Sequence, residues 1–192
     1  LSVLAKADGI TEMQSYDHAY YAEKLRKQKF DFNDEELKPY FQLDKVQEAV
    51  FGLAGKLFGL EFVETTDIQK YHADVKTYEI YEGENFKALL YADYHPRKGK
   101  RAGAWMTSFK NQYIKNGENH RPHISVVCNF TKPTAETPSL LTFNEVTTLF
   151  HEFGHALHGV LANTQYPNLS GTSVKWDFVE LPSQFLENYC YE

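Results

Sequence analysis

Two histidines and a glutamate stand together near the C-terminal end of the sequence, at a spacing that is typical of a zinc site. They are His151, Glu152 and His155, in the motif His-Glu-Phe-Gly-His. On a helix, residues four positions apart lie on one face, about 6 Å apart along the axis, so both imidazoles can bind a single Zn²⁺. Glu152 is not needed as a ligand and can accept a proton from a metal-bound water. The motif therefore predicts metal-assisted hydrolysis, with one zinc ion per chain.

The alternative is a buried structural helix with incidental polar residues. Three polar side chains on an otherwise apolar helix each need a partner, or each costs about 1–3 kcal/mol of folding free energy. A metal ion supplies a shared partner for the two imidazoles. We therefore expect zinc binding at this motif.

The segment around the motif is predicted to be a buried helix of about residues 142–161. Thr142 and Glu145 have the spacing of a capping box, which marks a helix start. The apolar side chains recur at helical spacing and are Phe143, Val146, Leu149, Phe150, Phe153, Leu157, Val160 and Leu161. Two roles for Gly154 remain open, namely the close approach of another backbone and tight helix packing. For His158 we expect a packing role.

A catalytic zinc site needs a third protein ligand and an open fourth position. A second helical stretch is predicted over about residues 179–191, and it can direct a carboxylate to the first helix. The candidate ligands are Asp177, Glu180, Glu187 and Glu192. From spacing alone Glu180 ranks first, and the other three stay open. Asp177 and Ser183 lie about one turn on either side of Glu180, and we expect them to hydrogen-bond to the ligand.

The first third of the sequence is predicted to be helical. One helix follows Ser15 or Asp17 as its N-cap and runs to about residue 29, and a second spans about residues 44–58 and ends at Gly59. Seven aromatic side chains of this region are expected in the core, namely Tyr16, Tyr20, Tyr21, Phe30, Phe32, Tyr40 and Phe41.

The middle third has the composition of β-strands. Residues 75–81 and 86–94 are rich in β-branched and aromatic side chains and flank a turn at 82–85, which predicts a hairpin. A third strand is predicted over 124–130. The basic segment 95–101 is expected to be a solvated loop, with phosphate binding as the alternative. The fold class is therefore α+β, mainly helical, with a small sheet of about three to four strands.

Composition limits the class of protein. The 192 residues carry a net charge of −6, and 42% of them are hydrophobic, which is typical of a globular domain and argues against a nucleic-acid binder. No apolar run is long enough to cross a bilayer and no signal peptide is visible, so we expect a cytoplasmic protein without membrane contact. Cys128 and Cys190 are expected to be buried thiols rather than a disulfide. Leu1 and Glu192 carry no capping signal or polar tail, so we expect a fragment of a longer protein.

Beyond these patterns, the stretches LFHEFGHALHGVLA and YPNLSGTSVKWDFVELPSQFLEN closely resemble the thimet oligopeptidase family of zinc metallopeptidases. The segments YYAEKLRKQKFDFNDEELKPYF, KRAGAWM and VVCNFTKP also look like its bacterial peptidyl-dipeptidase branch. The resemblance implies zinc ligands at His151, His155 and Glu180 and a general base at Glu152. It also implies a zincin-like fold in which the zinc helix lies beside a small sheet.

The resemblance further implies that residues 1–192 are a single partial catalytic domain. Its expected parts are a helical region (1–60), a small β region (61–130) and the zinc helices (142–192), with the C-terminal part of the family domain missing. The implied activity is zinc-dependent hydrolysis of short peptides, with release of C-terminal dipeptides. We expect a monomer whose partners are peptide substrates.

Two alternatives remain open at the level of the sequence. The first is an endo-acting oligopeptidase of the same family, since dipeptide release requires a group that binds the substrate carboxylate. The basic side chains available for this are Arg97, Lys98, Lys100 and Arg101. The second is a metal-stabilised module without turnover, in which His158 or Cys128 closes the zinc site as a fourth ligand.

Overall fold

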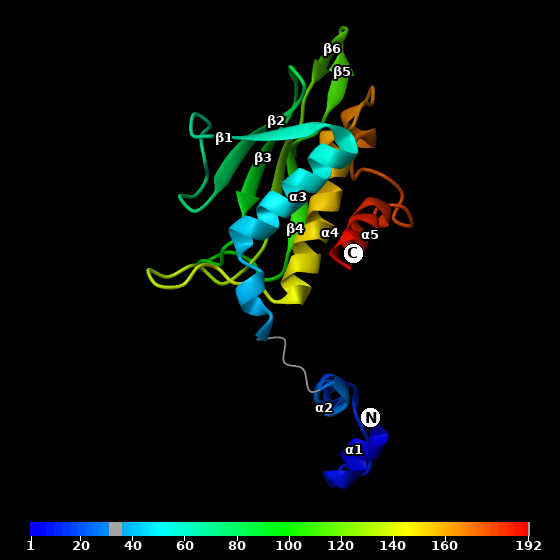
Figure 1. Ribbon diagram of the computed structural model, residues 1–192. Helices are drawn as coiled ribbons and strands as arrows, with labels where there is room; N and C mark the ends of the chain where they lie inside the picture. The colour runs from blue at the N-terminus through cyan, green and yellow to red at the C-terminus, as the bar shows by residue number, and fades with distance from the viewer. Residues whose placement is uncertain (31–35, 192) are drawn as a thin grey trace. The chain divides into compact units, whose positions relative to one another are not determined.

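The computed structural model describes residues 1–30 and 36–191 of the chain (Figure 1). The chain divides into two compact units, Leu1–Lys38 and Pro39–Glu192. The second unit contains the whole sheet and the predicted zinc site. A single domain with three successive regions over residues 1–192 stays a prediction.

The first unit is helical. Its elements, in chain order, are α1 (Ser2–Ala7), the 3-10 turn η1 (Ser15–Asp17) and α2 (His18–Phe30). The backbone N–H of Gln14 donates to Oδ2 of Asp17 (2.9 Å), which satisfies a free donor at the helix start. Lys24 of α2 forms an ion pair with Asp8, the residue that follows α1. The prediction of a helix that runs to about residue 29 is confirmed.

The expectation that the early aromatic side chains belong to the core is wrong for most of them. Four are exposed, namely Tyr16, Tyr20, Phe30 and Tyr40. Tyr21 is buried and Phe41 is partly buried against the core, whereas Phe32 lies outside the described residues. Three of the exposed rings belong to the two-helix unit. A unit of this size has too little volume to enclose large side chains on several sides.

The second unit is built on a mixed sheet. Its five strands, in spatial order, are β1 (Leu60–Thr65), β2 (Lys76–Glu82), β3 (Asn85–Asp93), β7 (His123–Val127) and β4 (Trp105–Lys110). β3 and β7 are parallel, and the other neighbours are antiparallel. A separate hairpin is formed by β5 (Tyr113–Lys115) and β6 (Glu118–His120). The α+β class is confirmed, but with helices at 39% and strands at 22%, a mainly helical chain is not clearly supported.

The predicted hairpin and third strand are confirmed, and the sheet is larger than the expected three to four strands. β2 and β3 are joined by a two-residue turn in which Gly83 has a φ of 57°, a conformation that favours glycine. The two strands of this sheet that the sequence did not predict, β1 and β4, are its edges. An edge strand is partly exposed on both faces, so its hydrophobic alternation is weak.

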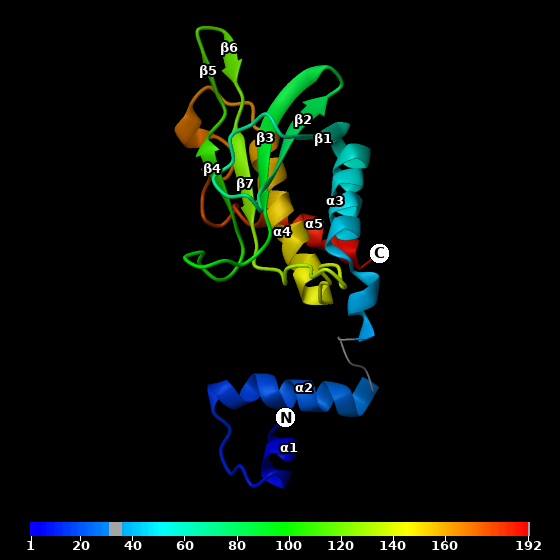
Figure 2. The ribbon, with the colours of Figure 1, turned by 90° about the vertical axis from the view of Figure 1, so that its left-hand side faces the viewer.

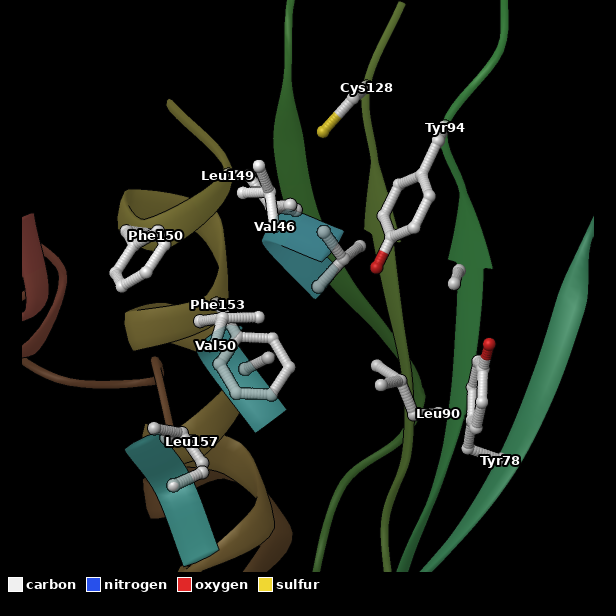
Figure 3. Close-up of a cluster of buried hydrophobic side chains, with 14 of the residues drawn as sticks. Val46, Val50, Tyr78, Leu90, Tyr94, Cys128, Leu149, Phe150, Phe153 and Leu157 are labelled. Atoms are coloured by element: carbon white, nitrogen blue, oxygen red, sulfur yellow. The ribbon is translucent and has the colours of Figure 1, made fainter. Parts of the chain in front are cut away.

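Two long helices, α3 (Leu43–Phe58) and α4 (Phe143–Val160), pack against one face of the sheet (Figures 1 and 2). The prediction of a helix over 44–58 is confirmed, and Gly59 ends it with a φ of 68°. Figure 3 shows the side chains gathered between these helices and the sheet, among them Val50, Leu90 and Phe153. None of these three is more than 1% exposed. This core holds α4 against the sheet.

The other face of the sheet carries a buried charge. The side chain of Asp93 is 2% exposed and accepts two hydrogen bonds from Arg97 (2.7 and 2.9 Å) and one from Lys100 (2.8 Å). The side chain of Lys100 is 3% exposed. The prediction of a solvated loop over 95–101 is therefore wrong at Lys100, because a buried carboxylate requires charged partners.

The C-terminal segment packs beside α4 (Figures 1 and 2). Its short elements are η4 (Pro167–Leu169), α5 (Leu181–Glu187) and η5 (Asn188–Cys190). The second helix was predicted from residue 179 but begins at Leu181, so Glu180 occupies the N-cap position. Cys128 is buried and Cys190 half-buried, both as free thiols. Among the described residues, none of the helices has the length and apolarity that crossing a bilayer requires.

Candidate metal centre

Helix α4 carries both histidines of the motif and begins at the predicted capping box. The backbone N–H of Thr142 donates to Oε2 of Glu145 (2.7 Å), and the backbone N–H of Glu145 donates to Oγ1 of Thr142 (3.2 Å). The apolar side of α4 is buried against the sheet, which fixes the rotation of the helix about its axis. His151 and His155 therefore lie on the side of α4 that meets Glu180.

The side chains of His151, His155 and Glu180 converge on one point. Nε2 of each histidine lies 3.1 Å from Oε2 of Glu180, and the three ligand atoms lie within 4.8 Å of one another. Ligand atoms around a tetrahedral zinc ion, each about 2.0–2.1 Å from it, are about 3.3 Å apart. Two imidazoles and a carboxylate are also a donor set that zinc accepts. The residues present therefore fit a bound divalent ion.

The other candidates for a ligand do not join this cluster within the described residues. Glu187 contacts His151, but at the ring nitrogen Nδ1 rather than Nε2. Asp177 is exposed, and Glu192 lies outside the part of the chain that is described. The two proposed fourth ligands of a closed site, His158 and Cys128, are likewise outside the three-residue cluster.

Gly154 lets the backbone at the start of α5 approach α4 at the level of the cluster. A Cβ atom at position 154 would lie 2.6 Å from the carbonyl oxygen of Pro182 and 2.6 Å from Cα of Ser183. Both are backbone atoms, so neither can move aside as a side chain does. Of the two roles left open for Gly154, the structure shows the close approach of another backbone. That backbone carries Glu180 two residues before Pro182.

Ser183 orients the carboxylate of Glu180. Its hydroxyl, in a fully buried residue, donates to Oε2 of Glu180 (2.8 Å) and to the backbone oxygen of the same residue (2.9 Å). This hydrogen bond, opposed by partial burial and aided by His155 and His151, holds the pKa of Glu180 below its usual value. The hydrogen bond predicted from Ser183 is therefore present, whereas none from Asp177 to Glu180 is found in the described part.

Glu152 is buried in a cleft that opens beside the cluster. The cleft has a volume of about 360 Å³ and is lined by Ala104, Asn144, Thr147, Thr148, His151, Glu152 and Glu187. Glu152 is only 7% exposed, and burial raises the pKa of its carboxyl group, an effect that the neighbouring His151 opposes. A carboxylate of raised pKa is a stronger base and accepts a proton more readily.

The second ring nitrogens of the three histidines on α4 differ in their surroundings. Nδ1 of His151 lies 2.5 Å from Oε1 of Glu187. In contrast, Nδ1 of His155 and Nδ1 of His158 are buried without a hydrogen-bond partner among the described residues. Burial lowers the pKa of both His155 and His158, which favours neutral imidazoles. The ring of His158 packs at 6.3 Å from that of Phe178, as expected for a packing role.

The contact between Glu187 and His151 was not predicted from the sequence, which gave Glu187 only as a candidate ligand. The available signal was the spacing of Glu180, Ser183 and Glu187, which is that of one helix face.

The basic residues proposed to bind a substrate carboxylate lie in two different environments. Arg97 and Lys100 are occupied by Asp93, as described above. Lys98 and Arg101 are exposed.

The chain is similar to known peptidases over nearly its whole length. The model of peptidase family M3 matches residues 1–192. The chain is 47% identical to a dipeptidyl carboxypeptidase of Escherichia coli strain K12 over 190 residues, which cover 98% of this chain and 28% of that protein. It is 41% identical to oligopeptidase A of the same strain over 196 residues, covering 100% and 29% respectively. It is also 42% identical over 202 residues to a probable cytosolic oligopeptidase A of Arabidopsis thaliana, covering 100% and 29%.

The chain thus spans less than a third of the length of these curated relatives. The family model, by contrast, covers all of it, and the sequence identity is high along nearly the whole chain. The resemblance seen in the sequence motifs is therefore confirmed, and the chain belongs to peptidase family M3.

Proposed function

We propose that the chain is the zinc-binding part of a metallopeptidase that hydrolyses peptide bonds of short peptides. The observation that carries this proposal is the convergence of His151, His155 and Glu180 beside the buried carboxylate of Glu152. Membership of peptidase family M3 and the names of the relatives, a dipeptidyl carboxypeptidase and an oligopeptidase, support peptide substrates. The proposed cofactor is one Zn²⁺ per chain, held by these two histidines and Glu180.

A zinc ion bound there would act as a Lewis acid and would lower the pKa of water. His151, His155 and Glu180 would hold the ion, and Glu152 lies in the cleft beside them. Glu152 accepts the proton of the attacking water as the oxygen adds to the scissile carbonyl carbon. It then donates this proton to the nitrogen of the leaving amine. The raised pKa of Glu152 assists the first step, because a carboxylate of higher pKa is the stronger base.

The direct test is Glu152→Gln in the full-length protein. We expect kcat to fall by about 10²–10⁴-fold, because an amide cannot accept the proton, while the zinc content stays near one per chain. Peptide-cleavage kinetics and metal analysis measure the two quantities. Glu48→Gln, at an exposed position on α3, is the matched control and should leave both unchanged. Loss of zinc together with activity in Glu152→Gln would contradict the proposal, since it would make Glu152 a ligand.

For the specificity of the whole protein, we propose the release of C-terminal dipeptides. The relative at 47% identity, named a dipeptidyl carboxypeptidase, supports this over the endo-acting alternative, which oligopeptidase A at 41% represents. The test is a digest of one peptide with a free and with an amidated C-terminus by the full-length protein. Dipeptide release from the free peptide alone supports the proposal. Internal cleavage of both peptides contradicts it.

We further propose a cytoplasmic monomer that binds neither nucleic acid nor membranes. The net charge of −6 opposes phosphate binding, and the name of the Arabidopsis relative includes the word cytosolic. Sedimentation equilibrium of the full-length protein tests the oligomeric state, and a dimer at micromolar concentration would contradict it.

A further inference from the structure

The ring of His151 is held at both of its nitrogen atoms. Nε2 lies 3.1 Å from Oε2 of Glu180, within the cluster, and Nδ1 lies 2.5 Å from Oε1 of Glu187. The side chains of His151 and Glu187 are 27% and 33% exposed, so the contact is partly shielded from solvent. A hydrogen bond that involves a charged carboxylate and is shielded in this way is stronger than a neutral one.

Glu187 is placed so that it does not itself bind the ion. The two nitrogen atoms of an imidazole point in different directions, so a carboxylate oxygen at Nδ1 does not also bind an ion at Nε2. Among the described residues, the group that can hold an ion consists of His151, His155 and Glu180 without Glu187. Glu187 therefore contacts a proposed ligand, His151, without being a ligand itself.

A single short helix provides this contact together with the carboxylate ligand. Glu180 is the N-cap of α5, Ser183 lies in its first turn, and Glu187 is its last residue. Positions that are three and seven residues apart lie on one face of a helix. The face of α5 that approaches α4 at Gly154 thus presents one carboxylate to the cluster and two groups that contact cluster residues.

The two histidines differ in this respect. Nδ1 of His155 is buried and has no hydrogen-bond partner in residues 1–30 and 36–191. Within the described chain, Nδ1 of His151 thus meets a carboxylate, whereas Nδ1 of His155 meets no hydrogen-bonding group. Of the two histidines, His151 is therefore the one whose second ring nitrogen contacts a carboxylate in the described chain.

We propose that Glu187 is a positioning residue for the metal ligand His151. By accepting the N–H of Nδ1, Glu187 holds the imidazole in the tautomer whose Nε2 lone pair faces the ion, and it fixes the rotation of the ring. The negative charge also makes the imidazole a better donor to the metal. The inference rests on the zinc site proposed above and extends it to a residue that does not touch the ion.

The test measures the zinc dissociation constant of the full-length protein by competition with a chelator. For Glu187→Ala we expect a rise of about 10–100-fold, the range found when such outer partners are lost. Glu187→Gln should fall between this variant and the wild type, because its amide keeps an oxygen acceptor but has no charge and can also present a donor to Nδ1. Glu187→Asp, which keeps the charge, should recover more affinity than Glu187→Ala. Gln184→Ala, at an exposed position of the same helix, should bind zinc as the wild type does.

A second readout is the visible spectrum of the cobalt-substituted protein, which should change in Glu187→Ala and stay unchanged in Gln184→Ala. Wild-type zinc affinity in a folded Glu187→Ala variant would overturn the inference, as would an equal loss in Gln184→Ala. If Glu187→Ala does not fold, wild-type affinity in the isosteric Glu187→Gln variant overturns it. A wild-type protein that binds no zinc, or a His155→Ala variant that binds it equally well, refutes the proposed zinc site instead.

Discussion

At the scale of single residues, the contacts of the site meet at one oxygen atom. Oε2 of Glu180 lies 3.1 Å from Nε2 of both His151 and His155, and it accepts the hydrogen bond of Ser183 at 2.8 Å. A carboxylate only accepts hydrogen bonds, so the single hydroxyl donor of Ser183 restricts how the group can rotate. The conformation of Glu180 that faces the histidines is thereby stabilised before any ion binds.

This contact leads to a prediction for Ser183→Ala. Without the hydroxyl, the carboxylate of Glu180 can rotate away, so the zinc dissociation constant should rise by about 10-fold or more. A chelator competition on the full-length protein measures this change.

The matched control for that substitution is Ser139→Ala. Ser139 is also buried and donates to the backbone oxygen of Thr131 (2.7 Å), but it lies outside the cluster. Its substitution should lower the free energy of unfolding by about 1 kcal/mol and leave zinc binding unchanged. Equal zinc affinities in the two serine variants would contradict the role given to Ser183.

At the scale of the element, the site depends on the contact between α4 and α5. A helix of seven residues is too short to be stable by itself, so α5 keeps its form through packing on α4. The closest approach is at Gly154, where a Cβ atom would meet two backbone atoms at 2.6 Å. Because residue 154 of α4 has no side chain, α5 can lie this close to α4. This close approach also sets the position of Glu180.

We expect Gly154→Ala to displace α5 and to lower the free energy of unfolding by about 1–3 kcal/mol, because overpacking strains both backbones. Zinc affinity should fall in parallel as Glu180 moves away from the histidines. Urea denaturation and chelator competition measure the two effects.

Gly52→Ala in α3 provides the control for this glycine. A Cβ atom at position 52 would meet no other atom within 4 Å, so the helix propensity of alanine should stabilise the protein by up to about 1 kcal/mol. If Gly154→Ala stabilised the protein in the same way, the close packing of α5 on α4 would be refuted.

At the scale of the whole molecule, the two faces of the sheet in the unit Pro39–Glu192 have different roles. One face and the helices α3 and α4 form the main core and support the cluster. The other face holds Asp93, at the end of β3, which is paired with Arg97 and Lys100. These ion pairs hold the segment that connects β3 to β4. Strand β4 is the edge strand that contacts α4.

Asp93 should make the stability of the protein depend on pH. Burial acts to raise its pKa, but the hydrogen bonds from Arg97 and Lys100 outweigh burial, and the net pKa is below the usual 3.8. Since the folded value is the lower one, the stabilisation is fully present above about pH 4 and is lost as the pH falls through the folded pKa.

For Asp93→Asn we therefore expect a loss of about 3–5 kcal/mol at pH 7, because Lys100 remains buried without its counter-charge. The difference from the wild type should shrink as the pH is lowered toward 3. Urea denaturation over this pH range measures it, with Asp67→Asn at an exposed position as the control. A difference that does not change with pH would show that the charge of Asp93 is not the cause.

The sequence by itself determined the features that depend on neighbouring residues. The capping box at Thr142, the helix over 44–58 and the hairpin around Gly83 were all predicted, because each is encoded in a few adjacent positions. The spacing of His151 and His155 belongs to the same class, since residues four apart on a helix always share a face.

Only the tertiary structure decided which distant groups meet. Spacing left four carboxylates open as the third member of the cluster, and the packing of α5 on α4 brings Glu180 to the histidines and Glu187 to the far side of one ring. The burial of Lys100 and the two edge strands were also not predicted from local patterns. The physical reason is the same in each case. A contact between residues far apart in the sequence depends on how whole elements pack, and a local sequence pattern carries no information about that packing.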